Sequence, residues 1–369
     1  MEFSRVASGN GLLIGMTIGA GMFALPYAVV AGGIFWSLLY LIVTISIVTR
    51  VHLLYGHVLY QDRERFRLPG YVRKYLGENF YRIALSSRFF SYYGILLAYG
   101  VLGGVFLSYL LPYFSPKYLT ILFFLIFFPL TYPKLKTAGE INLFFTLLLV
   151  LFTFLLFFML YPPSHFEKLP FFVRDAGSFL PYGVFLFAFS AASVIQEVVD
   201  VFGPHGKRVF EKSIYTSTFL VAIIYLLFVV AVLGVAGNGV AEDALSSLRS
   251  IAGGKIFILG AVLGFFAITT SYIPLALEIR YTWREDVKYT DTVSWFLASL
   301  VPLLLYLLNF SDFVAIVSLV GALGVGLEGI MILLLAHRVL KTNAMLTSLL
   351  VFCLALGALA GILKTLGIF

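Results

Sequence analysis

The sequence predicts an all-α integral membrane protein with eleven transmembrane helices. Of its 369 residues, 61% are apolar and only 12% are charged, about half the charged share of soluble domains. The apolar residues form long runs without the alternation of a β-barrel, and a helix is the remaining way to satisfy backbone groups in lipid. Short loops separate the runs. These observations exclude a soluble enzyme, a nucleic-acid-binding protein and a second soluble domain.

Each apolar run is read as a span because a helix needs about 20 apolar residues to cross the hydrocarbon core. The predicted spans are 9–31, 33–57, 84–112, 118–132, 138–160, 179–201, 212–236, 254–280, 291–309, 313–337 and 343–366. The fourth is the shortest. Loop 58–83 carries apolar residues at helical spacing beside Arg73 and Lys74, which predicts an amphipathic helix on the membrane surface. Those apolar residues are Leu68, Tyr71, Val72, Tyr75 and Leu76.

The positive charges predict the orientation. With a cytoplasmic N-terminus, six of the 25 Lys and Arg residues fall on the outer side: Lys117, Lys168, Arg174, Arg249, Lys255 and Lys364. Because cytoplasmic loops carry the excess of Lys and Arg, we expect the N-terminus inside and the C-terminus outside a cell membrane, plasma or inner. Cys353 is the single cysteine, so an internal disulfide and a cysteine-based metal site are excluded.

The first span contains features that allow a helix to break. Gly15, Gly19 and Gly21 lie near mid-membrane, and Pro26 follows. Glycine is permissive in φ, and proline removes an amide donor. Two interpretations stay open at this point: an unwound segment that lines a cavity, or tight helix packing through the small residues.

The run IGAGMFALPYAVVAGG, from Ile18 to Gly33, resembles the first-span signature of amino acid permeases. It is most similar to the amino acid/auxin permeases and to the bacterial aromatic and hydroxy amino acid permeases, which belong to the amino acid–polyamine–cation superfamily with the LeuT-type fold. The resemblance implies one transporter domain, 1–369, built from inverted five-helix repeats at 9–160 and 179–337 plus an extra span at 343–366. It also implies that spans 1 and 6 are both broken. The break in span 6 would lie between Phe187 and Ala192, although no glycine stands there.

A broken helix offers free amides on one half and free carbonyls on the other. We therefore expect Gly19, Ala20 and Gly21 to hold the carboxylate of an amino acid, and carbonyls near Ala188 and Ser190 to hold its ammonium. The resemblance implies that Phe187 or Phe189 closes the pocket from outside. Small residues, namely Ala188, Ala191 and Ala192, would leave room for a large side chain. Tyr92, Tyr93 and Tyr99 on span 3 are further candidates. The Phe-rich walls favour a neutral, hydrophobic or aromatic substrate.

The sequence AITTS in span 8, from Ala267 to Ser271, places three hydroxyls in an apolar helix. Each hydroxyl can bond back to its own helix. The resemblance instead implies a sodium site, with ligands from Ala267, Thr270 and Ser271 and from Gly15 and Ile18 of span 1.

Proton coupling is the rival to sodium. Some relatives carry a lysine in span 5, but Leu149 occupies that position here. Glu197, Glu278 and Glu328 remain as proton carriers, because an ionisable group inside a membrane is a functional candidate. The alternative is that they pair with arginines such as Arg5 or Arg280.

Together with the resemblance, the sequence leads us to expect a secondary active transporter that moves a neutral, hydrophobic or aromatic amino acid by alternating access, coupled to Na⁺. A proton-coupled permease, or a non-transporting amino acid sensor on the same fold, are the alternatives. An enzyme is not expected, since the histidines lie near span ends or in loops and no catalytic spacing occurs. No cofactor besides Na⁺ is expected, and the partners are the amino acid, the ion and lipid. No nucleic-acid partner is expected.

Overall fold

The computed structural model describes residues 2–62, 64, 66–132, 138–160, 169–249 and 253–365. Within these residues the regular secondary structure is helical throughout. The α-helices are α1 (Glu2–Thr17), α2 (Gly21–Gly32), α3 (Ile34–Gln61), α4 (Leu68–Leu76), α5 (Glu78–Leu110), α6 (Pro116–Leu130), α7 (Ala138–Met159), α8 (Leu180–Phe189), α9 (Ile195–Phe202), α10 (Lys207–Ala236), α11 (Gly254–Glu285), α12 (Asp291–Leu307), α13 (Phe313–Leu319), α14 (Gly326–Leu340) and α15 (Ala344–Thr365). Arg63, Arg65, Lys134, Lys136 and Lys168, which entered the orientation argument, lie outside the described residues.

Seven of the described helical segments are long and apolar enough to cross a membrane, and the bent pair α1–α2 gives an eighth. Three more apolar helices are shorter: α6, α12 and the part of α7 from Leu143 to Met159. Each predicted span therefore falls on a helix or on a helix pair. The all-helical membrane architecture is confirmed, while the number of eleven crossings stays a prediction.

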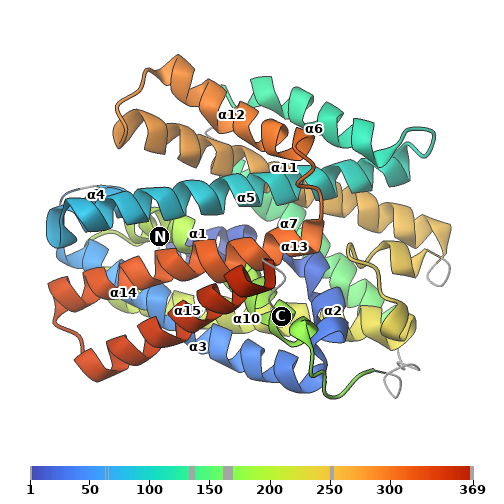
Figure 1. The fold of residues 1–369 in the computed structure, drawn as a ribbon, viewed down its shortest axis with the longest axis horizontal. Helices are drawn as coiled ribbons and strands as arrows, with labels where there is room; N and C mark the ends of the chain where they lie inside the picture. The colour runs from blue at the N-terminus through green and yellow to red at the C-terminus, as the bar shows by residue number, and fades with distance from the viewer. Residues whose placement is uncertain are drawn as a thin grey trace.

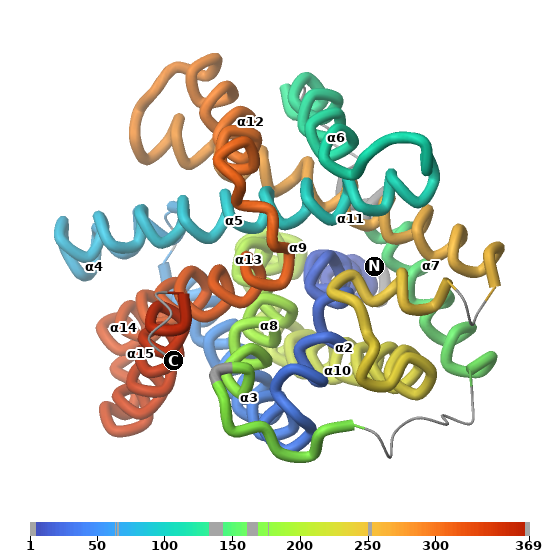
Figure 2. Tube along the Cα trace, turned by 45° about the vertical axis from the view of Figure 1, so that its right-hand side comes forward, coloured from blue at the N-terminus to red at the C-terminus, as the bar shows by residue number. Residues whose placement is uncertain are grey.

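The helices form a bundle around a central group that contains both predicted broken spans. Helix α8 packs against α2, α3 and α13, and α1 packs against α7, α9 and α10. Figure 2 shows α8 and α9 beside α1 and α2 near the middle of the molecule. The long helices α5 and α11 pack together, and α6 and α12 cover them on one side of the bundle (Figure 1). The site discussed below lies among α1, α2, α5, α8, α11 and α14.

Helix α4 confirms the amphipathic helix predicted in loop 58–83, and three residues of its apolar face are buried against other helices. Leu68, Tyr71 and Val72 are almost completely buried. They pack against α5 and α14, which are the neighbours of α4. Gly77, with φ of +93°, ends α4 and begins α5, a backbone conformation that favours glycine. The spacing of the apolar residues thus predicted the helix correctly. It did not show that other helices of the protein bury these residues.

Span 10 is also irregular. Between α13 and α14, residues 320–325 form a π-helix, a rare element that is often found at functional sites. This segment packs closely on α8, because glycines face each other there. A methyl group added to Gly183 would collide with the carbonyl oxygen of Ser318, and one added to Gly321 would collide with that of Gly183. The missing side chains let the two backbones approach as small residues do in membrane bundles.

Candidate functional site

The first span is broken where the sequence predicted it. Helices α1 and α2 meet at an angle of 52° across the residues after Thr17. The amides of Gly19 and Ala20 have no backbone acceptor within the described residues, and α2 then begins at Gly21 with the amides that an α-helix leaves unsatisfied. We expected glycine here because of its permissive φ, but the structure gives another reason. Neither Gly19 nor Gly21 has a positive φ; each instead allows a close approach.

The close approach joins the two predicted breaks. A methyl group on Gly21 would lie 2.9 Å from the Cα atom of Ala188 and 3.0 Å from the Phe187 ring, so span 1 touches span 6 here. A methyl group on Gly19 would lie 2.8 Å from the hydroxyl oxygen of Tyr99 on α5. Glycine at position 21 thus permits backbone contact between the two breaks, and glycine at position 19 leaves room for the Tyr99 hydroxyl.

Span 6 is broken without a glycine. Helix α8 ends at Phe189, and Ser190 adopts an extended conformation, with φ of −72° and ψ of 126°. The amide of Ala191 donates to Nε2 of His52 on α3 at 3.1 Å, and both groups are buried. The acceptor nitrogen carries no proton, so His52 is neutral with its proton on Nδ1. A side chain from another helix therefore satisfies the amide that the break exposes.

A tyrosine joins the ends of the two broken helices. The Tyr225 hydroxyl on α10 lies 2.6 Å from the carbonyl oxygen of Thr17 and 2.9 Å from that of Ala188. These carbonyls belong to the last turns of α1 and α8, where helices leave acceptors unsatisfied. The Ala188 carbonyl, which we expected to bind an ammonium, thus already has a partner, since the single hydroxyl proton can serve either oxygen.

A cavity of about 40 Å³ lies where the breaks meet. It is lined by Met16, Thr17, Gly21, Tyr92, Ile95, Tyr99, Phe187, Ala188, Ser190, Ser193, Ser271, Leu275, Val325 and Glu328. Its volume is close to that of one water molecule. An aromatic amino acid would therefore require the lining helices to move apart, as the rocking motion of transporters with broken helices allows.

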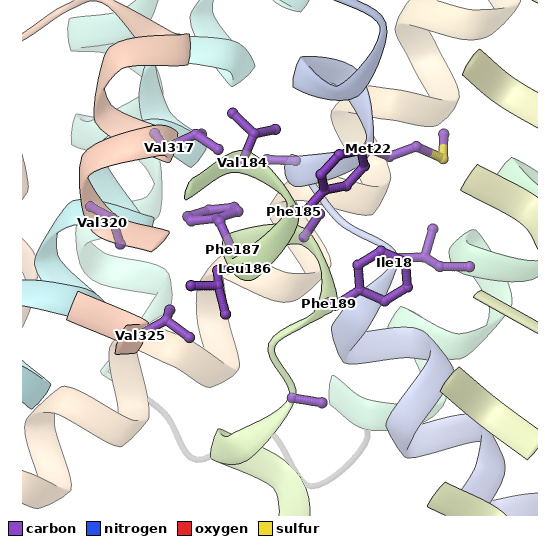
Figure 3. Close-up of a cluster of buried hydrophobic side chains, with 14 of the residues drawn as sticks. Ile18, Met22, Val184, Phe185, Leu186, Phe187, Phe189, Val317, Val320 and Val325 are labelled. Atoms are coloured by element: carbon purple, nitrogen blue, oxygen red, sulfur yellow. The ribbon is translucent and has the colours of Figure 1, made fainter. Parts of the chain in front are cut away.

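Half of the predicted substrate residues line this cavity: Gly21, Phe187, Ala188 and Ser190. Gly19 and Ala20 lie in the break beside it, and Ala192 lines a neighbouring cavity of about 20 Å³. Phe189, the alternative for the pocket aromatic, does not line this cavity, and its ring packs edge-on against Tyr225, with centroids 5.1 Å apart. Figure 3 shows Phe187 on the side of Val317 and Val320, and Phe189 on the side of Ile18.

A larger cavity of about 750 Å³ lies elsewhere, among α3, α8, α13 and α15. Tyr40, Tyr182 and Cys353 are among its mostly apolar lining residues. Neither break reaches it. We place the candidate site at the smaller cavity because the ends of both broken helices converge there, and a substrate with two opposite charges needs both.

The residues predicted for sodium lie on α1, in the break and on α11. Ala267 and Ser271 are completely buried, and Ser271 lines the cavity. The Thr270 hydroxyl donates to the carbonyls of Phe266 at 2.9 Å and Ala267 at 3.2 Å, as the back-bonding alternative expects. A hydroxyl that donates its proton keeps lone pairs for a cation, so this contact is compatible with either interpretation. Helix α7 packs against both α1 and α11.

Two of the three membrane glutamates, Glu278 and Glu328, pair with arginines other than the expected Arg5 and Arg280. Arg88 on α5 lies 2.9 Å from Glu278 and 3.7 Å from Glu328, and Arg67 also pairs with Glu278. Arg280 pairs with Asp291 instead. The Arg88 side chain is 6% exposed, and a buried charge of this kind requires such partners.

Glu197 differs from the other two glutamates. One of its carboxylate oxygens, Oε2, is buried without a hydrogen-bond partner in the part of the chain that the structure describes.

The sequence analysis did not identify His52 in span 2 and Tyr225 in span 7 as residues that bond to the backbone at the breaks. Each is a polar residue inside an apolar run, and this was the one available signal. Tyr99 and Tyr92, candidates from span 3, do line the cavity, whereas the Tyr93 hydroxyl donates to the carbonyl of Leu297 at 3.0 Å.

Comparisons with known proteins agree with the all-helical membrane fold. A model of the tryptophan/tyrosine permease family matches residues 3–360. No curated protein gives a sequence match. Among solved structures, MhsT in complex with L-phenylalanine superimposes with a TM-score of 0.72 at 15% identity, covering 98% of both chains. Mhp1, a nucleobase-cation-symport-1 family transporter in a closed conformation with bromovinylhydantoin, gives a TM-score of 0.65 at 14% identity, covering 89% of this chain and 77% of its own. These likenesses show the LeuT-type fold.

Proposed function

The chain belongs to the tryptophan/tyrosine permease family, and from this premise we propose that it moves a neutral aromatic amino acid by alternating access, coupled to Na⁺. Family membership and fold make it a multi-pass membrane protein of amino acid transport and not an enzyme. The aromatic substrate is supported by the family's description and by MhsT, which has the same fold and was solved with L-phenylalanine.

One observation carries the proposal: two broken helices abut at one cavity. The first amides of α2, including that of Gly21, carry the positive end of a helix, and the last carbonyls of α8 carry the negative end. A zwitterion presents one charge to each. We assign the carboxylate to the amides of Gly19, Ala20 and Gly21. The ammonium goes to carbonyls at the end of α8, where the Tyr225 hydroxyl now donates to Ala188.

Sodium coupling is supported by the chemistry of the ligand set. The carbonyls of Gly15, Ile18 and Ala267 and the hydroxyls of Thr270 and Ser271 are all oxygen donors, which suit a hard cation. Ser271 also borders the substrate cavity. An ion bound to this residue would be one side chain away from the substrate, which gives a physical route for coupling.

Proton coupling is the second candidate, and the observation that favours it concerns Glu197. This residue lies in the first turn of α9, shortly after the break in span 6, and its buried Oε2 lacks a hydrogen-bond partner within the described residues. A protonated carboxyl would need no counter-charge there. Glu278 and Glu328 are weaker candidates because Arg88 already pairs with both.

We further propose the topology. Residues 9–160 and 179–337 form the two inverted repeats within the single domain 1–369, and 343–366 forms the additional span. The breaks in the first and the sixth spans, at corresponding places of the two halves, support this division. The N-terminus lies in the cytoplasm and the C-terminus outside a plasma or inner membrane, as the distribution of Lys and Arg favours.

The deciding experiment is uptake into proteoliposomes. Purified protein is reconstituted, and labelled phenylalanine, tyrosine and tryptophan are supplied with an inward gradient of Na⁺ or of choline at equal pH. We expect accumulation that depends on Na⁺. Accumulation driven by a pH gradient, equal in Na⁺ and choline, would establish the proton candidate. Binding in a thermal-shift assay without any uptake would make the chain a sensor and overturn transport.

A competition assay tests the carboxylate assignment separately. Phenylalanine methyl ester lacks the carboxylate charge, so we expect it to compete with labelled substrate at least tenfold less well than phenylalanine. Tenfold corresponds to about 1.4 kcal/mol, which is modest for a charge-assisted contact. Equal competition by the ester would show that the amides of the broken helix do not anchor the substrate.

A further inference from the structure

One wall of the cavity is not used by the proposed function. The broken helices account for the charged end of an amino acid. Apart from Ser271, and from Tyr99 whose hydroxyl lies beside Gly19 in the break, the wall supplied by α5, α11, the π-helix and α14 consists of Tyr92, Ile95, Leu275, Val325 and Glu328. Since the broken helices bind the carboxylate and the ammonium, this wall is left to face the side chain of the substrate. Three of these residues are apolar, so the polar atoms of Tyr92 and Glu328 stand out.

The Tyr92 hydroxyl is buried without satisfying its hydrogen bonds. Tyr92 is 2% exposed, and its hydroxyl has no hydrogen-bond partner within the described residues. Its ring lies under the guanidinium of Arg88, 4.6 Å from centroid to Cζ, which holds the ring in place. A buried hydroxyl is costly to leave unpaired, and a ligand that enters the cavity can pair with it.

The Glu328 carboxylate has a counter-charge but retains acceptor capacity. The residue is 5% exposed, and Arg88 Nη1 lies 3.7 Å from its Oε1, beyond hydrogen-bond distance. The closer partner of Arg88 is Glu278, at 2.9 Å. A carboxylate has about four lone-pair sites, so this one can accept bonds from a ligand in the cavity.

We propose that Glu328 is a specificity-determining residue, which accepts a hydrogen bond from an O–H or N–H group on the ring of the substrate, with the Tyr92 hydroxyl completing the contact. The inference rests on the proposed function, since it concerns the same cavity. It favours phenol and indole side chains over a plain phenyl ring. The physical reason is that a site built to bond a polar group rejects the analogue that lacks it, because its own buried polar atoms stay unpaired.

The test compares two substrates that differ by one hydroxyl, tyrosine and phenylalanine. Affinities are measured by competition against a single labelled substrate in proteoliposomes. We expect the wild type to prefer tyrosine by tenfold or more. Glu328→Met should reduce this preference at least fivefold by weakening tyrosine, with less than a threefold change for phenylalanine. Glu328→Gln keeps an acceptor oxygen and should retain a larger share of the preference. Tyr92→Phe should reduce the preference as well.

Glu278→Gln is the matched control. Glu278 contacts the same arginine, but it does not line the cavity. The Glu278→Gln variant should leave the ratio of the affinities for tyrosine and phenylalanine unchanged. Tyr92→Phe removes a hydroxyl that has no partner, so it should fold normally and keeps the test valid if Glu328→Met does not fold.

Three outcomes would overturn the inference while the proposed function stands. They are a wild type that transports phenylalanine and tyrosine equally well, a Glu328→Met variant that weakens both substrates alike, and a Glu328→Gln variant that loses pH dependence for both. The last would assign Glu328 to proton transfer. Failure of the wild type to transport either amino acid would overturn the proposed function itself, and the inference with it.

Discussion

At the scale of single residues, the candidate site depends on backbone groups that side chains from other helices control. Tyr225 provides one hydroxyl proton for two carbonyl oxygens, one at the end of α1 and one at the end of α8. His52 provides the acceptor for the amide of Ala191. Both residues hold the breaks from spans that are themselves continuous, so they position the site without belonging to a motif.

Removal of the Tyr225 hydroxyl should loosen both breaks. In Tyr225→Phe the carbonyls of Thr17 and Ala188 lose their donor, which should cost about 1–3 kcal/mol. We expect a lower melting temperature in detergent and weaker uptake. Tyr182→Phe is the control, because that hydroxyl makes one long contact of 3.4 Å, away from the breaks. Equal effects of the two variants would contradict the role assigned to Tyr225.

Gly21 should tolerate no side chain. In Gly21→Ala the new methyl group would lie 2.9 Å from a backbone atom of Ala188, which cannot rotate away. We expect a loss of about 1–3 kcal/mol from overpacking, and uptake reduced by tenfold or more because the breaks separate. Gly254→Ala in α11 is the control, since nothing lies within 4 Å of an added methyl group there. Full uptake by Gly21→Ala would show that contact between the breaks is not required.

At the scale of elements, α4 is held to the end of α3 by a polar contact. Asp62 accepts hydrogen bonds from Lys74 at 2.8 Å, from Tyr75 at 2.7 Å and from the amide of Glu64 at 3.0 Å. Burial acts to raise the pKa of the Asp62 carboxyl, but these bonds together lower it below its ordinary value. This contact, together with the apolar face of α4, fixes the helix to the bundle.

The lowered pKa of Asp62 predicts a dependence of stability on acid. The charged carboxylate stabilises the folded protein fully above its ordinary pKa of 3.8, and this contribution is lost as the pH falls through the lower folded value. We expect the melting temperature to fall below about pH 4 and Asp62→Asn to flatten that part of the profile. Glu78→Gln, in the exposed pair with Arg73, should leave the profile unchanged. If the melting temperature of Asp62→Asn fell as steeply below about pH 4 as that of the wild type, the stabilising role assigned to the Asp62 carboxylate would be contradicted.

At the scale of the whole molecule, the substrate cavity and the proposed ion site share helices. Helices α1 and α11 contribute to both, and α7 packs against each of them. An ion that ties α1 to α11 would therefore bias the arrangement of the helices that also enclose the substrate. Thermodynamic linkage requires the two ligands to raise each other's affinity by the same factor.

Two neighbouring threonines separate this linkage from a structural effect. Thr270→Val removes a proposed sodium ligand, and we expect the Na⁺-dependent gain in substrate affinity to fall to less than a third of its wild-type value. Thr269→Val is matched, because that hydroxyl also donates to the carbonyl of Phe266, at 3.0 Å, but is not a proposed ligand. It should keep the gain. Substrate affinity that is equal in Na⁺ and choline in the wild type would remove the basis of the sodium proposal.

The sequence by itself determined the membrane class and the positions of the helices, and it marked the place where the first span could break. These follow from local properties: apolar runs of spanning length, and glycine and proline that weaken a helix where they stand. The break in span 6 was inferred from resemblance, since Ser190 and Ala191 carry little local signal.

Only the tertiary structure decided which groups meet. It brought Gly21 against Ala188, placed Phe187 at the cavity and turned Phe189 away, and joined Arg88 to Glu278 and Glu328. It also covered α4 with protein. The physical reason is that an apolar residue in lipid is equally suited to face a lipid tail or another helix. Close packing between helices, and the need to satisfy buried polar groups, choose between these options, and both depend on contacts far apart in the chain.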